Sequence, residues 1–539
     1  MYPSTNTHTN FFQNGRQRQS SAPTETGWEG GKKAPNGAWK PVKNSPFPNR
    51  LLSGLYSLAQ RLLFPSYWAA DRLLSLIECC SCCSQHRCYH CCSPWGLLAG
   101  PWLLLLLLLS MPVALLGLLL WLPLQAARRP FAYKHTKLSR PPELWELPGK
   151  GRAFSFVSAN VCLLPDGLAT FSNLGQMWRR VACIGQRLTQ GEFLPPTKYG
   201  ATMSSPPEGG AVPGGISVPF PPAVDFVCLQ EVFDQRAAAR LCQLLSPVYE
   251  HIVYDVGSYG LQGCSALKLF NSGLLVASRY PVLAAQYRCY LNGTGEDALS
   301  AKGLLSVQVR GCPRGGEPRA TLGLPPCSHV HHSAEDAQTR YGQLTKGLSW
   351  VKLFQDAQTQ PGDVVAFDVF CGDFNFDNCS LEQNHNIFHQ YQDPCRVGPR
   401  QDKPWAIGTC LNMKRTLEQE EGRRTYLACP ILQDGRPDPS AAGSPWEGRR
   451  IDYILYREHR APISLTTVSA QLQGAGLTES LFMGRGIRRA TQHGPGLPGR
   501  VRAWGPGRLG SLLALTLTCC EMLAGTSAPL WAVSCAALG

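Results

Sequence analysis

An uncharged apolar segment, Trp95 to Leu124, constrains this chain more than any other feature. It is longer than the about 20 residues that a helix needs to cross a bilayer, and too long for an ordinary soluble helix, so it predicts a membrane segment. Pro112 lies in the middle and predicts a kink, so a true span and a hairpin that enters and leaves on one face both fit the sequence. Arg128 and Arg129 follow, and the positive-inside rule favours an exit that faces the cytosol or the mitochondrial matrix.

The residues before this segment add two membrane features. Leu51 to Ala70 is apolar but contains Gln60, Arg61 and Pro65, which suits an interfacial or re-entrant helix. Adjacent cysteines then precede the long apolar segment and are typical acceptors for S-acylation. They are Cys79, Cys80, Cys82, Cys83, Cys91 and Cys92. A zinc site that adds His86 and His90 is the alternative, although the spacing of the cysteine pairs fits no familiar ligand pattern.

Composition divides the chain into four parts. Residues 1–46 are polar and basic and are expected to be disordered, and residues 47–130 form the membrane-associated region with the cysteine cluster. Residues 131–457 have a globular composition, broken by a flexible Pro- and Gly-rich insertion at 193–224, and residues 458–539 are a divergent tail to which we assign no stable fold. The net charge of +14 favours anionic partners, such as acidic lipid headgroups or nucleic acid.

Within the globular part, β-rich runs alternate with helical patterns. Strands are expected at 153–157, 225–229, 272–278, 304–309, 364–370 and 449–455, and helices at 235–245 and 339–354. This alternation predicts an α/β sandwich.

Polar side chains stand at the ends of several expected strands. Asp373 and Asn375 are two residues apart, so on an extended backbone they point to the same side and can hold a phosphate, a water or a metal. A turn that merely closes a strand has the same sequence pattern. Glu231 ends an apolar run, where a carboxylate needs a partner such as Mg²⁺, and Asn160 is placed to add an amide oxygen.

Two weaker motifs lie elsewhere in the globular part. His329 and His331 are expected to share one face of a strand, where a lone histidine would more often be structural. Asp452 is an inward-facing carboxylate on the last expected strand.

Taken in order, these motifs resemble the endonuclease/exonuclease/phosphatase superfamily. The set is Asn160, Gln230-Glu231, Asn271-Ser272-Gly273, His329-Val330-His331, Gly372-Asp373-Phe374-Asn375 and Arg450-Ile451-Asp452-Tyr453. Longer stretches, including 158–166, 228–234 and 403–409, are similar to the membrane-bound neutral sphingomyelinases. The resemblance covers roughly residues 46–480 and implies a four-layer, DNase-like α/β sandwich preceded by a hydrophobic membrane region.

The resemblance also implies a chemistry. It implies an enzyme that uses Mg²⁺, with Mn²⁺ as a possible substitute, to hydrolyse sphingomyelin to ceramide and phosphocholine at a membrane. Glu231 and Asn160 would bind the metal, and Asp373 and Asn375 would position the phosphate and the attacking water.

Further roles follow from the same resemblance. His329 would hydrogen-bond a phosphoryl oxygen, and Asn271 would line the pocket. Lys302 would contact the phosphate, with Asp297 holding or releasing it. Asp452 would steady a histidine that comes later in the chain.

That later histidine is where the chain departs from the family pattern. The family has an Asp-His pair, with the histidine as general base, and the matching residues here are Glu479 and Ser480. A serine hydroxyl lacks the pKa of an imidazole, and His493 lies in a turn-like context. The alternative is therefore a catalytically impaired membrane protein that keeps the fold. A second departure is Pro325-Pro326, which predicts a distorted strand before His329.

Partners and location are expectations of the same kind. Anionic phospholipids are expected as activators, and no nucleic acid is expected because the hydrophobic segments argue against a nuclease of this fold. The N-terminal extension and the short insertion resemble mitochondria-associated members of the family, so we expect the mitochondrial membrane, the endoplasmic reticulum, or both.

Overall fold

The computed structural model describes residues 42, 44–83, 94–138, 154–169, 176–190, 224–262, 266–310, 321–331, 336–359, 363–378, 380–399, 401–403, 450–457, 465–472 and 479–486. In 77–83, 94–98, 465–472 and 479–486, and at residues 190, 321, 322, 364 and 381, only the backbone is described. The expected acylation sites Cys91 and Cys92 lie outside this set, as do the side chains of Cys79, Cys80, Cys82 and Cys83.

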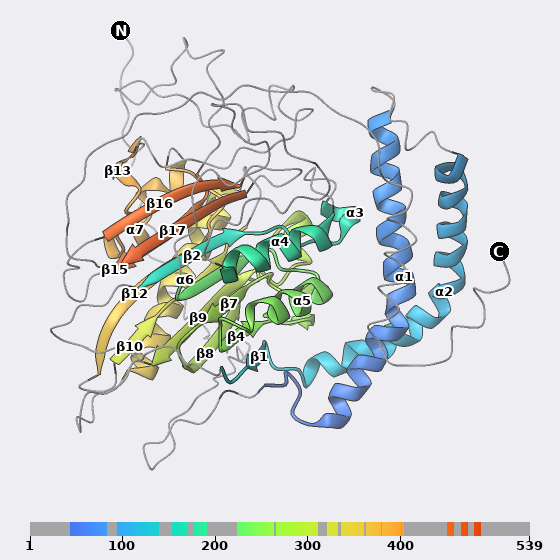
Figure 1. The fold of residues 1–539 in the computed structure, drawn as a ribbon, viewed down its shortest axis with the longest axis horizontal. Coiled ribbons are helices and arrows are strands. Elements are labelled where there is room, and N and C mark those ends of the chain that lie inside the picture. The colour runs from blue at the N-terminus through green and yellow to red at the C-terminus, as the bar shows by residue number, and fades with distance from the viewer. Residues whose placement is uncertain are drawn as a thin grey trace, which may run out of the picture. The chain divides into compact units, whose positions relative to one another are not determined.

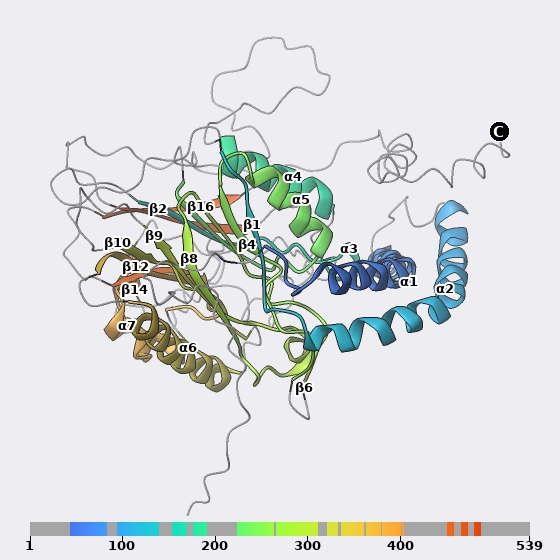
Figure 2. The same ribbon diagram turned by 90° about the horizontal axis from the view of Figure 1, so that it is seen from below.

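Two long helices form an antiparallel pair at the N-terminal end of the described chain, α1 (Arg50–Cys83) and α2 (Pro94–Ala126) (Figure 1). The Ser66 and Ser110 hydroxyls lie 2.7 Å apart between them. Gly117 allows the close approach, because a Cβ there would lie 2.9 Å from the Leu62 Cβ. Within the described residues, Ala99–Ala126 is the one helix long and apolar enough to cross a membrane. Helix α2 continues through Pro112 and bends along its length, as Figure 2 shows.

The remaining elements form two stacked sheets. The seven-stranded sheet has the order β1 (Ala132–His135), β4 (His251–Tyr254), β7 (Leu275–Ser278), β3 (Phe226–Gln230), β2 (Ser155–Asn160), β17 (Glu479–Gly486) and β16 (Leu465–Leu472). The second sheet has the order β10 (Thr321–Leu324), β12 (Val364–Asp373), β11 (Cys327–His329), β9 (Gly303–Arg310) and β8 (Val282–Cys289), with β15 (Asp452–Arg457) beside β12. Two further sheets have two antiparallel strands each, β5 (Gly260–Gln262) with β6 (Ala266–Lys268), and β13 (Arg396–Gly398) with β14 (Gln401–Asp402).

Helices cover the outer face of each sheet (Figure 2). Helices α4 (Met177–Gln190) and α5 (Gln235–Leu245) lie on the seven-stranded sheet, and α6 (Ala337–Gln358) and α7 (Ile387–Gln390) lie on the other. Short helical turns complete the connections, α3 (Asp166–Ala169), η2 (Gly295–Ala298) and η3 (Leu381–Asn384). The predicted four-layer α/β sandwich is confirmed.

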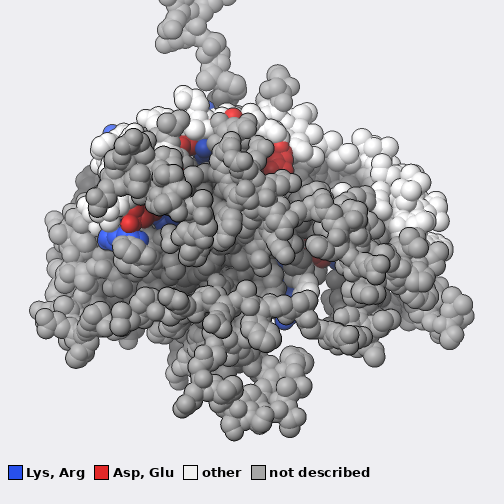
Figure 3. All heavy atoms as spheres, turned by 90° about the horizontal axis from the view of Figure 1, so that it is seen from above, with Lys and Arg blue, Asp and Glu red and all other residues white. Residues whose placement is uncertain are grey.

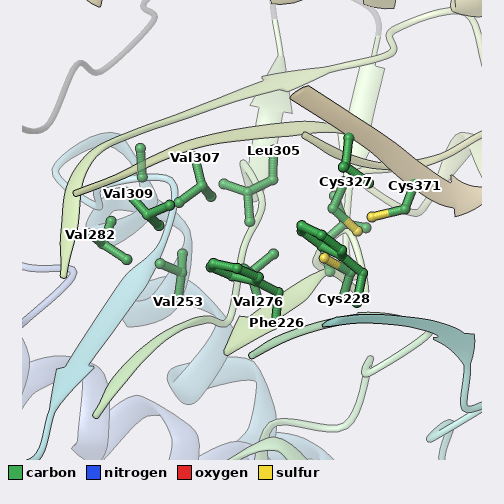
Figure 4. Close-up of a cluster of buried hydrophobic side chains, with 14 of the residues drawn as sticks. Phe226, Cys228, Val253, Val276, Val282, Leu305, Val307, Val309, Cys327 and Cys371 are labelled. Atoms are coloured by element: carbon green, nitrogen blue, oxygen red, sulfur yellow. The ribbon is translucent and has the colours of Figure 1, made fainter. Parts of the chain in front are cut away.

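The central core lies between the two sheets (Figure 4). Phe226 and Val276 from one sheet face Val307 and Val309 from the other. Three buried thiols, Cys228, Cys327 and Cys371, meet in the same layer. All eight cysteines whose pairing is described are free.

Local sequence signals placed several elements well. The helix expected at 235–245 is α5, and its start is fixed by Asp234, whose Oδ1 accepts hydrogen bonds from the Arg236 and Ala237 amides. The distorted strand expected at Pro325-Pro326 is also present, because these residues separate β10 from β11.

One expectation about the tail was wrong. Residues after 457 were assigned no stable fold, but β16 and β17 both come from that segment. β17 pairs antiparallel with β2, and Leu481 lies opposite Ala159. The sheet therefore extends to Gly486.

Candidate active site

Four strand ends from both sheets meet at one edge of the sandwich. Asn160 ends β2, Glu231 follows β3, His329 ends β11 and Asp373 ends β12. β2 runs parallel to β3, and β11 runs parallel to β12, so in each sheet the two carboxyl ends lie side by side. Strand register thus brings together four of the residues predicted from the sequence.

Asn160 lies between the two carboxylates. Its Nδ2 donates to Glu231 Oε1 at 2.7 Å and to Asp373 Oδ2 at 2.9 Å. His329 is fully buried, and its Nε2 is 3.9 Å from each of these oxygens. Ligand atoms of Glu231, His329 and Asp373 all lie within 4.8 Å of one another. Two carboxylates with an adjacent amide fit a hard divalent cation such as Mg²⁺.

Glu231 is held in an unusual backbone conformation, with φ at +58°. Gly273 packs against it: its own φ is +71°, and a Cβ there would lie 2.8 Å from the Glu231 Cα. The Val232 amide donates to the Gly273 carbonyl at 2.8 Å. The Asn271-Ser272-Gly273 motif thus shapes the turn that carries Glu231.

Asn271 was expected to line the substrate pocket, but its contacts in the structure are with the turn that carries Glu231. It is 1% exposed, and its Oδ1 accepts from the Gly273 amide at 2.9 Å. Its Nδ2 lies 3.5 Å from the Val232 carbonyl. In this structure the Asn271 side chain stabilises the turn at Glu231 through its contacts with Gly273 and Val232.

Asp373 is a buried carboxylate with a perturbed pKa. Burial and the neighbouring Glu231 carboxylate raise the pKa of Asp373 to about 6, against the lowering effect of the Asn160 hydrogen bond. Two carboxylates this close in a buried site favour a bound cation, and carboxyl groups with a raised pKa are typical of functional sites.

Asn375 does not lie on an extended backbone, which corrects the sequence argument for its direction. β12 ends at Asp373, and Asn375 has a φ of +52°. Asp373 Oδ1 accepts from the Asn375 amide at 2.9 Å, which closes a tight turn. Asn375 Nδ2 then donates to the Val330 carbonyl at 3.0 Å. That carbonyl also accepts from Lys302 Nζ at 3.4 Å, so Asn375 and Lys302 lie close together.

Lys302 is held by Asp297, with 2.8 Å between Nζ and Oδ1. The other Asp297 oxygen lies 3.0 Å from His331 Nδ1, and His331 Nε2 lies 2.7 Å from Asp336 Oδ2. Sequence reasoning put His331 on the same face as His329, but β11 ends at His329 and His331 belongs to this second network. Asp336 follows five residues after His331, and no local pattern indicates their contact.

Asp452 lies directly opposite Asp373 in the pairing of β12 with β15, and is 2% exposed. β17 approaches the same edge from the other sheet. Because Leu481 lies opposite Ala159, residue 480 falls level with Asn160 along the strand pair. The backbone therefore brings position 480 to the edge where the other predicted residues meet.

Two family models match the chain. The neutral sphingomyelinase N-terminal transmembrane region matches residues 51–127, and the endonuclease/exonuclease/phosphatase family matches residues 205–473. Sphingomyelin phosphodiesterase 5 of Danio rerio is 39% identical over 82% of this chain and 97% of that protein. The chain belongs to the neutral sphingomyelinase family.

Other members of the neutral sphingomyelinase family show similar coverage. Sphingomyelin phosphodiesterase 5 of Mus musculus is 42% identical over 82% of this chain and 93% of that protein. Sphingomyelin phosphodiesterase 3 of Homo sapiens is 32% identical, over 81% and 97%. Among solved structures, SmcL covers 62% of this chain and 99% of that chain, with 17% identity and a TM-score of 0.37. The matching transmembrane-region family and helix α2 make this neutral sphingomyelinase a membrane-associated protein.

Proposed function

We propose that this chain hydrolyses sphingomyelin to ceramide and phosphocholine at a membrane surface, with Mg²⁺ as cofactor and Mn²⁺ as a possible substitute. The observation that carries the proposal is the meeting of Glu231, Asp373 and Asn160 at the edge shared by both sheets. Relatives that align with over nine-tenths of their length are named sphingomyelin phosphodiesterases, which supports the substrate class.

Glu231 and Asn160 would hold the metal, with Asp373 beside them. When bound, the cation would polarise the phosphodiester and stabilise the charge that develops on its oxygens. The Asn160 amide now turns its nitrogen to the carboxylates, and its oxygen accepts from the Cys162 amide at 3.1 Å. For Asn160 to act as a ligand, its amide must rotate so that the oxygen faces the carboxylates.

The remaining residues would bind the phosphate. Asn375 and His329 offer donors beside Asp373, and orient the phosphate for in-line attack by water. Lys302 would contribute a positive charge once Asp297 releases it, since the two now form a 2.8 Å pair. Asp452 would orient a base near position 480.

A second candidate function follows from position 480. Register places this position level with Asn160, where a general base is expected, but it holds serine. A chain with this scaffold and no base would bind the membrane and the substrate but turn the substrate over slowly. Loss of a positioned base typically costs about 10²–10⁴-fold in rate.

One experiment separates the two candidates. Choline-labelled sphingomyelin in mixed micelles is incubated with the purified full chain and Mg²⁺, with EDTA as the control. The double variant Glu479→Asp/Ser480→His is assayed in parallel, because β17 is present in the structure to carry the new side chains. Mg²⁺-dependent turnover by the native chain supports the first function. Turnover by the double variant alone supports the second, and no turnover by either excludes hydrolysis of sphingomyelin.

Location and lipid dependence are further parts of the proposal. We place the chain in the mitochondrial membrane or the endoplasmic reticulum, with acylation of the cysteine cluster as an added anchor and anionic phospholipids as activators. The net charge of +14 supports the preference for anionic lipid. Described Lys, Arg, Asp and Glu side chains are few and scattered on the face in Figure 3, so this preference rests on the sequence as a whole.

A further inference from the structure

A second group of metal-ligating side chains lies far from the active-site residues in the sheet order. His135 is on β1, at the outer position of the seven-stranded sheet, and His251 lies directly opposite it on β4. Glu250 immediately precedes β4. Ligand atoms of these three residues all lie within 4.8 Å of one another.

The geometry points to a Zn²⁺-binding site formed by His135, Glu250 and His251. A bound ion there would stabilise the pairing of β1 with β4. His135 Nε2 lies 2.8 Å from Glu250 Oε1, and the two imidazole rings stack with centroids 4.8 Å apart. Two imidazole nitrogens and one carboxylate oxygen are a usual zinc donor set, and they favour Zn²⁺ over Mg²⁺. The fourth position would be left to water.

The contacts of His251 are those of a ligand that is already oriented. Tyr133 OH lies 2.6 Å from His251 Nδ1, which leaves Nε2 as the ligand atom. His251 is itself buried, so its ring is held in this orientation by the surrounding side chains.

The His135 ring must turn to close the site, because the nitrogen lone pairs of two parallel, stacked rings do not converge on one ion. Zinc bonds of about 2.0–2.2 Å place donor atoms about 3.2–3.6 Å apart, and the ligand atoms of the three residues already lie within 4.8 Å of one another. The His135 side chain is 44% exposed and is the member that can move. Bound zinc is expected to hold β1 more firmly against β4. This matters because β1 is the first strand after helix α2 and pairs with β4 alone among the described strands.

The test uses the full chain, purified in detergent and stripped of metal, with Zn²⁺ as the probe. Competition with a chromophoric chelator counts the tightly bound zinc equivalents in the native chain, in His135→Ala and in the matched control His389→Ala. His389 is an exposed histidine on α7, outside this group. Any zinc held by cysteines or by the active site is the same in all three proteins. A difference in zinc equivalents between the native chain and His135→Ala therefore measures binding at the proposed site.

We expect His135→Ala to bind one equivalent fewer than the native chain, and His389→Ala to match the native chain. Tyr133→Phe should weaken the site by about tenfold through the lost contact to Nδ1. Zinc should also slow hydrogen exchange of the β1 and β4 amides by about tenfold in the native chain but not in His135→Ala. Equal zinc stoichiometry and equal affinity in the native chain and His135→Ala would overturn the proposal, as would exchange protection that survives this substitution.

Discussion

At the scale of single residues, the site depends on backbone conformations that few side chains tolerate. Glu231 and Asn375 both have positive φ, and neither is a glycine. Such strain persists only where surrounding contacts enforce it, and it is common at functional sites. For Glu231 the enforcing contact is Gly273, which no bulkier residue can replace.

Substitution of Gly273→Ala should therefore damage both fold and site. The new Cβ would meet the Glu231 backbone at 2.8 Å, in a conformation that L-residues avoid. We expect a loss of about 2–4 kcal/mol in the free energy of unfolding, measured by urea denaturation. Gly342→Ala, in helix α6 with open space around it, is the control and should stabilise slightly. Equal stability of both variants would show that Gly273 does not shape the turn.

The raised pKa of Asp373 makes a second residue-scale prediction. A folded-state pKa of about 6, above the ordinary value of an aspartate, stabilises the protein at low pH, and this contribution is lost as pH rises through 6. In EDTA, the melting temperature of the native chain should fall between pH 5 and pH 7. Asp373→Asn should remove this part of the fall and stabilise the metal-free protein at pH 7 by about 2 kcal/mol. A pH profile that is identical in the two proteins would refute this.

Sequence reasoning singled out Asn160, Glu231 and Asp373 because each stands where an apolar run ends, and their side chains meet in the structure. It misjudged Asn375, since the left-handed turn there depends on a hydrogen bond that the Asn375 amide donates to the Asp373 side chain rather than on residue spacing. It also missed the partners of His251, which come from a strand more than a hundred residues earlier in the chain. Cross-strand pairs of this kind leave no local pattern.

At the scale of elements, a buried ion pair joins the end of α2 to the loop after β4. The Arg128 side chain is 2% exposed, and its guanidinium lies 2.6 Å from Asp255 Oδ2. The same group donates to the backbone carbonyls of Asp255 and Gly257 at 2.7 and 2.9 Å. Asp255 Oδ1 in turn accepts from Tyr259 OH at 2.7 Å.

Breaking this pair should be costly. Arg128→Met leaves the Asp255 carboxylate buried without its cation, and we expect a loss of about 3–5 kcal/mol in stability. Asp255→Asn should cost a similar amount, and the double variant should cost less than the sum of the two. Chemical denaturation of the full chain measures all three. Strict additivity would show that the residues act independently.

Element boundaries were predictable where a local signal fixes them. Asp234 caps α5, and Pro325-Pro326 divides β10 from β11, and both signals are visible in the sequence. β16 and β17 were not predicted, because the composition after residue 457 offers no clear alternation. The place of β17 in the sheet is set by pairing with β2, which is distant in sequence, and β16 pairs with β17 in turn.

At the scale of the whole molecule, the exposed face of α2 accounts for membrane association. Leu109 and Leu116 are 69% and 62% exposed, far more than apolar side chains of a soluble core. Leu109→Asp/Leu116→Asp should move the chain from the floating to the soluble fraction in liposome flotation, since each buried charge costs about 2.5–3.5 kcal/mol. Leu109→Ala/Leu116→Ala is the matched control and should still float. Undiminished flotation of the aspartate variant would mean that this face does not contact lipid.

The position of β2 between β3 and β17 has a consequence for synthesis on the ribosome. β3 emerges soon after β2, but β17 begins only at Glu479. At about 5–20 residues per second, the nascent chain waits on the order of 20–60 s before that neighbour exists. Throughout this interval one side of β2 offers unpaired backbone amides and carbonyls to any other extended chain. Translation that stops before β17 would leave a membrane-associated chain with this strand unpaired on one side, a form that chaperones or proteases would have to recognise.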